Sequence, residues 1–165
     1  MRTSTVAQAS SLVRPWAAVW DRAGVDHDLD ILVGAADADL DQQLSDGLDA
    51  FNVSATVGIT PQLELTVSVR DAAGLVGGAS GWTWGTCAGI GMVWVRDDAR
   101  GTGLGGRLMA AFESAARGRG CTQVLVSSFT FQAPGFYERH GYVEFARSEG
   151  LPVEAEADVH FRKAL

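Results

Sequence analysis

The residues best suited to chemistry lie in one stretch, where glycines alternate with other residues between a hydrophobic run and an amphipathic pattern. This stretch, residues 93–106, reads VWVRDDARGTGLGG. Glycines at alternate positions let several backbone amides converge on one anion without obstruction by a Cβ atom. The start of a helix adds unpaired amides and the positive end of the helix dipole. The pattern predicts a pyrophosphate-binding loop made of Arg100, Gly101, Thr102, Gly103, Leu104, Gly105 and Gly106, with the arginine as a charged donor.

Two other phosphate-binding patterns come close to this loop. A Walker loop would end in Gly-Lys followed by Ser or Thr, whereas Arg107 follows the last glycine here. The spacing of Gly101, Gly103 and Gly106 does satisfy the dinucleotide-binding Gly-x-Gly-x-x-Gly pattern. That pattern belongs at the head of a βαβ unit, but the strands predicted before the loop are antiparallel and no acidic residue ends the next strand. A glycine-rich turn without a ligand is the plainer alternative.

The loop needs strands before it, and the sequence predicts three. Residues 63–69 alternate between apolar and polar side chains, which is typical of a half-buried strand. A turn at residues 71–74 predicts that residues 75–84 return antiparallel to that strand, and a second turn at Gly85-Thr86 leads into a strand at residues 87–95.

The elements after the loop are equally regular. A helix is predicted with Leu104, Leu108, Phe112 and Ala115 on one face and an end at Gly118 and Gly120. A buried strand follows at residues 124–126, then a short helix with Pro134 in its first turn and Gly141 at its end. Two final strands are expected at residues 142–147 and 158–163.

The N-terminal part divides into an extension at residues 1–30 and the start of the domain at residue 31. We expect residues 1–11 to be disordered and residues 31–33 to form a short strand. Asp37 then caps a helix whose apolar stripe is Leu40, Leu44, Leu48 and Phe51. Residues 31–165 would thus form one mixed α/β domain with a mostly antiparallel sheet flanked by helices.

Composition excludes several classes of function. A chain of 165 residues is enough for one compact domain, and its formal charge of −7 disfavours nucleic-acid binding. Cys87 and Cys121 are too few for a disulfide scaffold, and the three histidines lack metal-ligand spacing. Residues 72–95 carry no charge, but their seven glycines favour strands over a membrane helix. We therefore expect a cytoplasmic protein without a metal, a membrane span or a nucleic-acid partner, and leave a homodimer open.

Two stretches together resemble one family. Residues 100–105 resemble the Arg/Gln-x-x-Gly-x-Gly/Ala motif of the GCN5-related N-acetyltransferases (GNAT), at the same junction of strand and helix. Residues 133–142, APGFYERHGY, resemble the family's late Ala-x-x-Phe/Leu-Tyr-Glu-Lys-x-Gly-Phe helix. The resemblance covers roughly residues 30–165, and residues 1–30 have no counterpart in the minimal fold of the family.

The resemblance implies a fold, a cofactor and a general acid. Strands 4 and 5 of the family's sheet, here around residues 93–95 and 124–127, would splay apart. The pantetheine of acetyl-CoA would lie in the gap against the backbone of Val93, Trp94 and Val95, with its pyrophosphate on the glycine loop. A backbone amide near Val93 would polarise the acetyl carbonyl. Tyr137 would protonate the departing thiolate, since a phenol with a pKa of about 10 keeps its proton at neutral pH.

The chain departs from the family at the general base and near the acceptor. Many relatives place a glutamate on the strand that ends at Val95, but residues 87–95 contain no acid. Either water relays the proton of the amine or another residue serves, and Glu64 on a neighbouring strand is one candidate. Thr130 stands where many relatives carry asparagine, and His140 is interpreted as a helix-end residue. The aromatic character of the surroundings predicts an acceptor pocket lined by Asn52, Trp82, Trp84, Phe129 and Phe131. Alternation places Trp82 and Trp84 on the same face of their strand, and the alternative is that one of them is a core residue.

The function expected from these features is an N-acetyltransferase that acts on the amine of a small molecule, a metabolite or an antibiotic. The amine would attack acetyl-CoA directly within a ternary complex. Two alternatives stay open: an acetyl-CoA-binding sensor without catalytic activity, and an N-acetyltransferase of proteins or peptides.

Overall fold

The computed structural model of the chain describes residues 30–165, in two compact units that divide between Gly58 and Ile59. The expected disorder of residues 1–11 lies outside the described residues. The predicted domain boundary at residues 30/31 stays a prediction.

The first unit contains helix α2, which spans Ala38–Ala55. As predicted, Asp37 is its N-cap: the carboxylate accepts hydrogen bonds from the amides of Asp39 and Leu40, both at 3.0 Å. The predicted strand at residues 31–33 is wrong. These three side chains are at least 90% exposed, and no strand of the described chain pairs with them. An apolar run this short forms a strand only where a neighbouring strand provides hydrogen-bond partners for its backbone amides and carbonyls.

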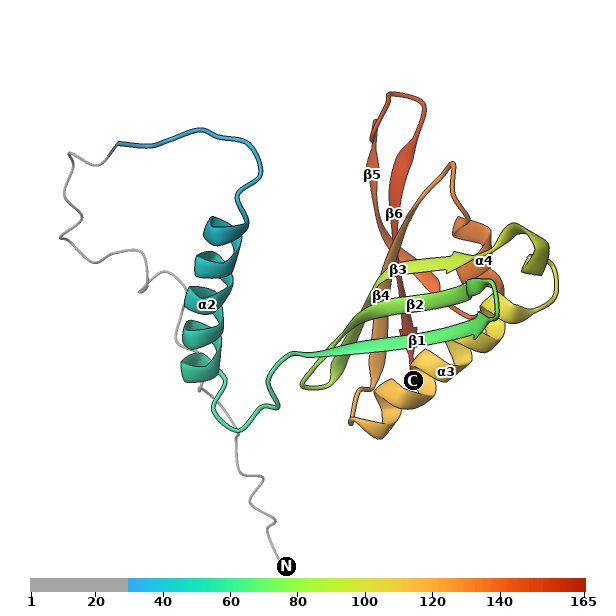
Figure 1. The fold of residues 1–165 in the computed structure, drawn as a ribbon, viewed down its shortest axis with the longest axis horizontal. Helices are drawn as coiled ribbons and strands as arrows, with labels where there is room; N and C mark the ends of the chain where they lie inside the picture. Colours follow the sequence, from blue (N-terminus) through green and yellow to red (C-terminus); the bar gives the residue numbers. More distant parts are fainter. Residues whose placement is uncertain (1–29) are drawn as a thin grey trace, which may run out of the picture. The chain divides into compact units, whose positions relative to one another are not determined.

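The second unit is built on a six-stranded sheet with the order β1-β2-β3-β4-β6-β5 (Figure 1). Its strands are β1 Leu63–Asp71, β2 Gly74–Trp84, β3 Cys87–Val95, β4 Gln123–Phe129, β5 Val143–Glu149 and β6 Ala157–Ala164. Only β3 and β4 run parallel, and every other neighbouring pair is antiparallel. The mixed, mostly antiparallel sheet predicted from the sequence is confirmed.

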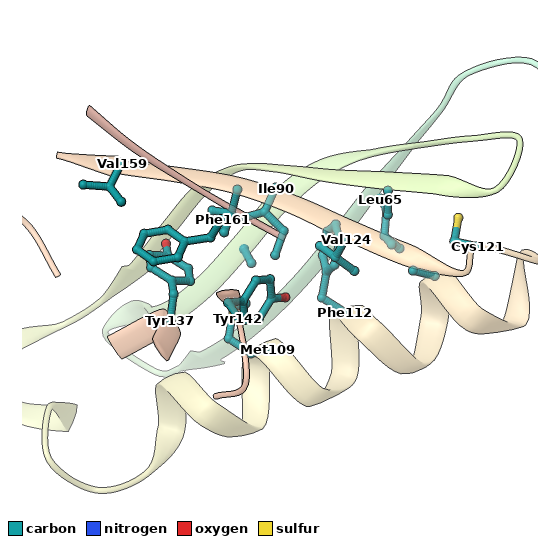
Figure 2. Packing of buried hydrophobic residues seen from close by; sticks show 14 residues of the cluster. Leu65, Ile90, Met109, Phe112, Cys121, Val124, Tyr137, Tyr142, Val159 and Phe161 are labelled. Atoms are coloured by element: carbon teal, nitrogen blue, oxygen red, sulfur yellow. The ribbon is translucent and has the colours of Figure 1, made fainter. Parts of the chain in front are cut away.

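One face of this sheet carries the hydrophobic core, which packs on α3 (Leu104–Gly118) and the short α4 (Pro134–Arg139). Figure 2 shows Met109 and Phe112 rising from α3 towards Ile90 of β3 and Val124 of β4. As predicted, α3 ends at Gly118 and Pro134 lies in the first turn of α4. Leu104, Leu108 and Phe112 of the predicted apolar face are buried.

A buried ion pair joins α3 to the last strand. Glu113 is only 5% exposed, and its carboxylate accepts from the Lys163 ammonium at 2.7 and 2.9 Å. The hydroxyl of Tyr142 donates to the same carboxylate at 3.1 Å. This network satisfies a charge whose burial would otherwise be costly.

No helix among residues 30–165 is long and apolar enough to cross a membrane.

Candidate active site

The sheet opens between β3 and β4. The two strands pair from Cys87 opposite Gln123 to Ile90 opposite Val126, and then they part. Beyond this point β4 pairs only with β6, while β3 keeps only β2. From Gly91 onward, one edge of β3 therefore presents backbone amides and carbonyls that no strand uses, as an extended ligand would require.

A β-bulge lies at the point where the strands part. Ser80 pairs with Met92 and Gly81 pairs with Ile90, so Gly91 is an extra residue in β3. Because of this extra residue, Val93 points to the same face as Ile90, towards α3, although the two are three positions apart. The bulge thus changes the direction of the unpaired backbone groups of β3 where this strand borders the gap.

A hollow of about 590 Å³ occupies the gap. It is lined by Ile90, Gly91, Met92, Val93, Trp94, Val95, Arg100, Val126, Ser127, Ser128, Gln132, Ala133 and Tyr137. Tyr137 and Val93 reach it from the face covered by α3 and α4, whereas Met92 and Ser127 lie on the opposite face. Groups from both faces of the sheet therefore meet in this gap.

Tyr137, the predicted general acid, projects from α4 into the core beside the gap (Figure 2). Its side chain is 8% exposed, and its ring packs on Phe161, Tyr142 and Phe136 with centroid distances of 5.9, 5.8 and 5.2 Å. Burial raises the pKa of the phenol above its usual value, so it keeps its proton across the neutral range.

The glycine loop borders a second hollow of about 550 Å³ that adjoins the first. Gly101 and Gly103 have positive φ angles of +76° and +82°, and a Cβ atom at either would point into open space. Gly103 caps α3 without a side-chain hydrogen bond. The amides from Gly101 to Gly106 find no acceptor among the described residues, as expected for the first turn of a helix. These amides are free to bind an anion.

Ion pairs and hydrogen bonds hold this loop in place. The guanidinium of Arg96 binds Asp71 at 2.8 Å and Asp98 at 2.7 Å, which lowers the pKa of both carboxyl groups. Arg100 donates from Nε to the carbonyl of Val95 at 3.1 Å, and it pairs with the preceding Asp97 at 2.8 Å. The loop is therefore fixed by contacts that leave its amides unused.

Three of the predicted loop residues make or allow contacts within the protein that explain why these residue types occur there. The hydroxyl of Thr102 donates to the carbonyl of Ala99 at 2.7 Å and so closes the turn. A Cβ atom on Gly105 would lie 3.1 Å from the ring of Phe136, and one on Gly106 would lie 2.6 Å from His140 Nε2. Glycine at positions 105 and 106 thus lets α4 pack closely against the start of α3.

Two titratable residues that the sequence did not assign to the loop are among those that line its hollow: Arg139 and His140. His140 is held by a 2.7 Å hydrogen bond between Nδ1 and the carbonyl of Phe136, which leaves Nε2 near Gly106. Arg139 can place a positive charge beside the free amides, and His140 can form a hydrogen bond through Nε2. Arg139 is the last residue of α4 and His140 is its C-cap, so their signal in the sequence was the motif at residues 133–142.

Glu64, Trp82 and Trp84 lie on β1 and β2 and do not line the gap. Glu64 is exposed on β1, two strands from β3, and it does not line the gap. Trp82 and Trp84 share one face of β2, as predicted, and the indole of Trp82 covers Gly89 rather than the gap. Asn52 belongs to α2 in the other unit.

Phe129 and Phe131 follow the gap-lining part of β4. Their rings stack at a centroid distance of 5.3 Å with planes 8° apart. Thr130 between them is tied to Glu156 and Ala157 by hydrogen bonds, so it anchors the chain between β4 and α4. The aromatic pair is thereby held on a fixed turn.

Comparison with known proteins agrees with this arrangement. Residues 63–144 match the family model described as "Acetyltransferase (GNAT) domain". Over 120 residues the chain is 30% identical to Acetyltransferase Atu2258 of Agrobacterium fabrum, covering 69% of this chain and 83% of that protein. The crystal structure of an acetyltransferase from Bacillus cereus matches with a TM-score of 0.69 and 28% identity, covering 82% of this chain and 98% of that chain.

A further relative is similar over a shorter stretch. Over 72 residues the chain is 47% identical to blasticidin-S acetyltransferase of Streptomyces morookaense, covering 43% of this chain. The match spans only half of that protein's length. Taken with the matched domain and the splayed strands, these similarities show that the chain belongs to the GNAT acetyltransferase family.

Proposed function

We propose that this acetyltransferase transfers an acetyl group to the amine of a small cationic molecule, by direct attack within a ternary complex. The observation that supports this most is the 47% identity to blasticidin-S acetyltransferase, whose name states a small-molecule antibiotic as substrate. The formal charge of −7 adds to this, because a negative surface concentrates cations near the protein.

The residues of the glycine loop and of β3 fit acetyl-CoA, the cofactor of GNAT acetyltransferases. The free amides from Gly101 to Gly106, with Arg139 and His140 beside them, suit its pyrophosphate. The free edge of β3 at Val93 and Val95 suits the amide-bearing pantetheine arm. When bound, acetyl-CoA supplies an acetyl group activated as a thioester.

The chain itself supplies a proton donor and a strand edge beside the gap. Tyr137 holds a proton at its phenol oxygen, in a position that borders both hollows. A buried neutral phenol can donate this proton to a thiolate as negative charge develops on sulfur. The bulge at Gly91 turns the unpaired amides that follow it, so one of them can stabilise a carbonyl oxygen that gains charge.

The gap also has the dimensions of a small-molecule site. Its volume of about 590 Å³ lies within the range of about 300–1,000 Å³ that is typical of ligand pockets. The stacked pair Phe129 and Phe131 follows the gap-lining part of β4 in the sequence and offers a flat apolar surface. Such a surface favours a planar or cationic group on the acceptor.

A panel of amines tests the proposal directly. The purified chain is incubated with acetyl-CoA and one amine at a time, and the released thiol is measured against a control without amine. The panel holds blasticidin S, an aminoglycoside, a polyamine, free amino acids and a short peptide. We expect thiol release with small cationic amines. Release with the peptide alone would favour a peptide acetyltransferase, and acetyl-CoA binding without release would favour a sensor.

A further inference from the structure

The gap between β3 and β4 lacks a group that could take a proton from an amine. Its polar lining among the described residues consists of Arg100, Ser127, Ser128, Gln132 and Tyr137, and none carries a carboxylate or an imidazole. A typical alkylamine has a pKa of about 10 and arrives as an ammonium ion, which must lose a proton before nitrogen can attack. The proton must therefore pass to water or to a side chain beside the gap.

Two titratable side chains of β6 lie one strand away from the gap. His160 pairs directly with Ser127, which lines the gap, and Asp158 lies two residues earlier on the same strand. Val159 and Phe161 face the core on the side of Tyr137 (Figure 2). Since side chains alternate along a strand, Asp158 and His160 share the opposite face with Ser127.

The two side chains also lie close to each other. Asp158 Oδ2 is 3.6 Å from His160 Nε2, and the side chains are 20% and 36% exposed respectively. The other carboxylate oxygen, Asp158 Oδ1, is buried without a hydrogen-bond partner. Within residues 30–165 it is the only buried side-chain nitrogen or oxygen atom that lacks one. A buried carboxylate oxygen needs a donor, which a ring movement, a water molecule or a bound ammonium group can provide.

The surroundings of His160 contain few other charges. On its own strand the charged neighbours on the same face are Asp158 and the exposed Arg162. Opposite it, β4 places Ser127 between Leu125 and Phe129, and β5 places Ala146, Ser148 and the ring of Phe145. A carboxylate at 3.6 Å is thus the nearest group able to stabilise an imidazolium ion here.

We propose that His160 accepts the proton of the acceptor's ammonium group and that Asp158 positions the imidazole and stabilises its cation. The N–H bond of the ammonium ion breaks, and its electron pair stays on nitrogen as the lone pair that attacks. The proton binds a ring nitrogen of His160, which passes it to bulk water through its exposed side. The inference rests on the proposed function only in requiring an amine as acceptor, and it replaces Glu64 as the candidate base.

The test measures kcat/KM for the acceptor against pH, with whichever amine of the panel the wild type acetylates. His160→Gln should lower kcat/KM about 100-fold at neutral pH, within the range of general base catalysis, and leave the Kd of acetyl-CoA unchanged. The loss should shrink as pH rises, because the amine then arrives already deprotonated. Asp158→Asn should lower kcat/KM by a smaller factor, and this loss should also shrink as pH rises.

Two further variants separate chemistry from structure. Imidazole added to His160→Ala should restore part of the rate, which a merely structural role would not allow. Arg162→Gln changes a charge on the same face and should keep the wild-type profile. A wild-type pH profile in His160→Gln, or no rescue by imidazole in a folded His160→Ala, would overturn the inference alone. Turnover of peptide amines only would overturn the small-molecule proposal alone, and absence of turnover with every amine would overturn both.

Discussion

Replacing Tyr137 by phenylalanine should slow the chemical step and leave binding and folding nearly intact. The ring is fixed by stacking on Phe161 and by edge contacts with Tyr142 and Phe136, all of which phenylalanine keeps. No protein group of the described chain is hydrogen-bonded to the Tyr137 hydroxyl, so its removal leaves no partner unsatisfied. We expect a stability change below about 1 kcal/mol.

The expected loss of rate is much larger. General acid catalysis contributes about 10²–10⁴-fold, and the raised pKa of Tyr137 keeps its proton available throughout the neutral range. Because the proton is needed only as the thiolate forms, kcat should fall while KM changes little. The measurement is thiol release in steady state and in a single turnover, with acetyl-CoA affinity taken from calorimetry.

Tyr142 provides a matched control, because its ring is a neighbour in the same aromatic cluster. Its hydroxyl donates to Glu113 rather than facing the gap, and Glu113 keeps both contacts to Lys163 when that bond is lost. Tyr142→Phe should therefore cost about 1 kcal/mol of stability and leave kcat unchanged. If Tyr137→Phe kept the wild-type rate in both assays, Tyr137 would be a packing residue and water would protonate the thiolate.

Three other substitutions test the rest of the structure. Gly103→Val should raise the Kd of acetyl-CoA at least about tenfold, because φ of +82° disfavours a side chain at this position, which borders the hollow; unchanged affinity in a folded variant would contradict the pyrophosphate-binding loop. Lys163→Met should cost about 3 kcal/mol in urea unfolding, because it leaves the buried Glu113 charge without its main partner. Arg96 lowers the pKa of its two aspartate partners, so their contribution to stability is present above about pH 4 and is lost as pH falls below it. Arg96→Met should flatten this acid dependence in unfolding curves measured between about pH 2.5 and 5.

Local patterns predicted the elements well. The alternation from Leu63 to Val69 predicted β1, and the carboxylate of Asp37 capped α2 as expected. In each case the determinant lies within a few residues of the element that it forms. The strand predicted at residues 31–33 failed for the complementary reason, since a strand depends on a partner that its own sequence does not specify.

Features that depend on register between distant strands could not be predicted. The bulge at Gly91 lies in a run without charges and with many glycines, where alternation gives no sign of an extra residue. The neighbourhood of His160 and Ser127 arises only once β6 pairs with β4, because 32 residues separate these positions in the sequence. Likewise, a Cβ atom at position 105 would crowd Phe136, a contact that the spacing of the glycines does not reveal.

The proposed anion site at the glycine loop is compatible with the formal charge of −7, because most charges of the chain act only over short distances. Charges further apart than about 8–10 Å are largely screened at physiological salt, so the glycine loop is governed by what lies beside it. Free amides at the start of α3 and the guanidinium of Arg139 supply positive charge there, whereas Arg100 is partly neutralised by Asp97. On the other face of the sheet, Asp158 offers an unpaired carboxylate oxygen beside His160. The proposed sites therefore place an anionic cofactor against free amides and Arg139, and a cationic amine near an unpaired carboxylate oxygen on the opposite face of the sheet.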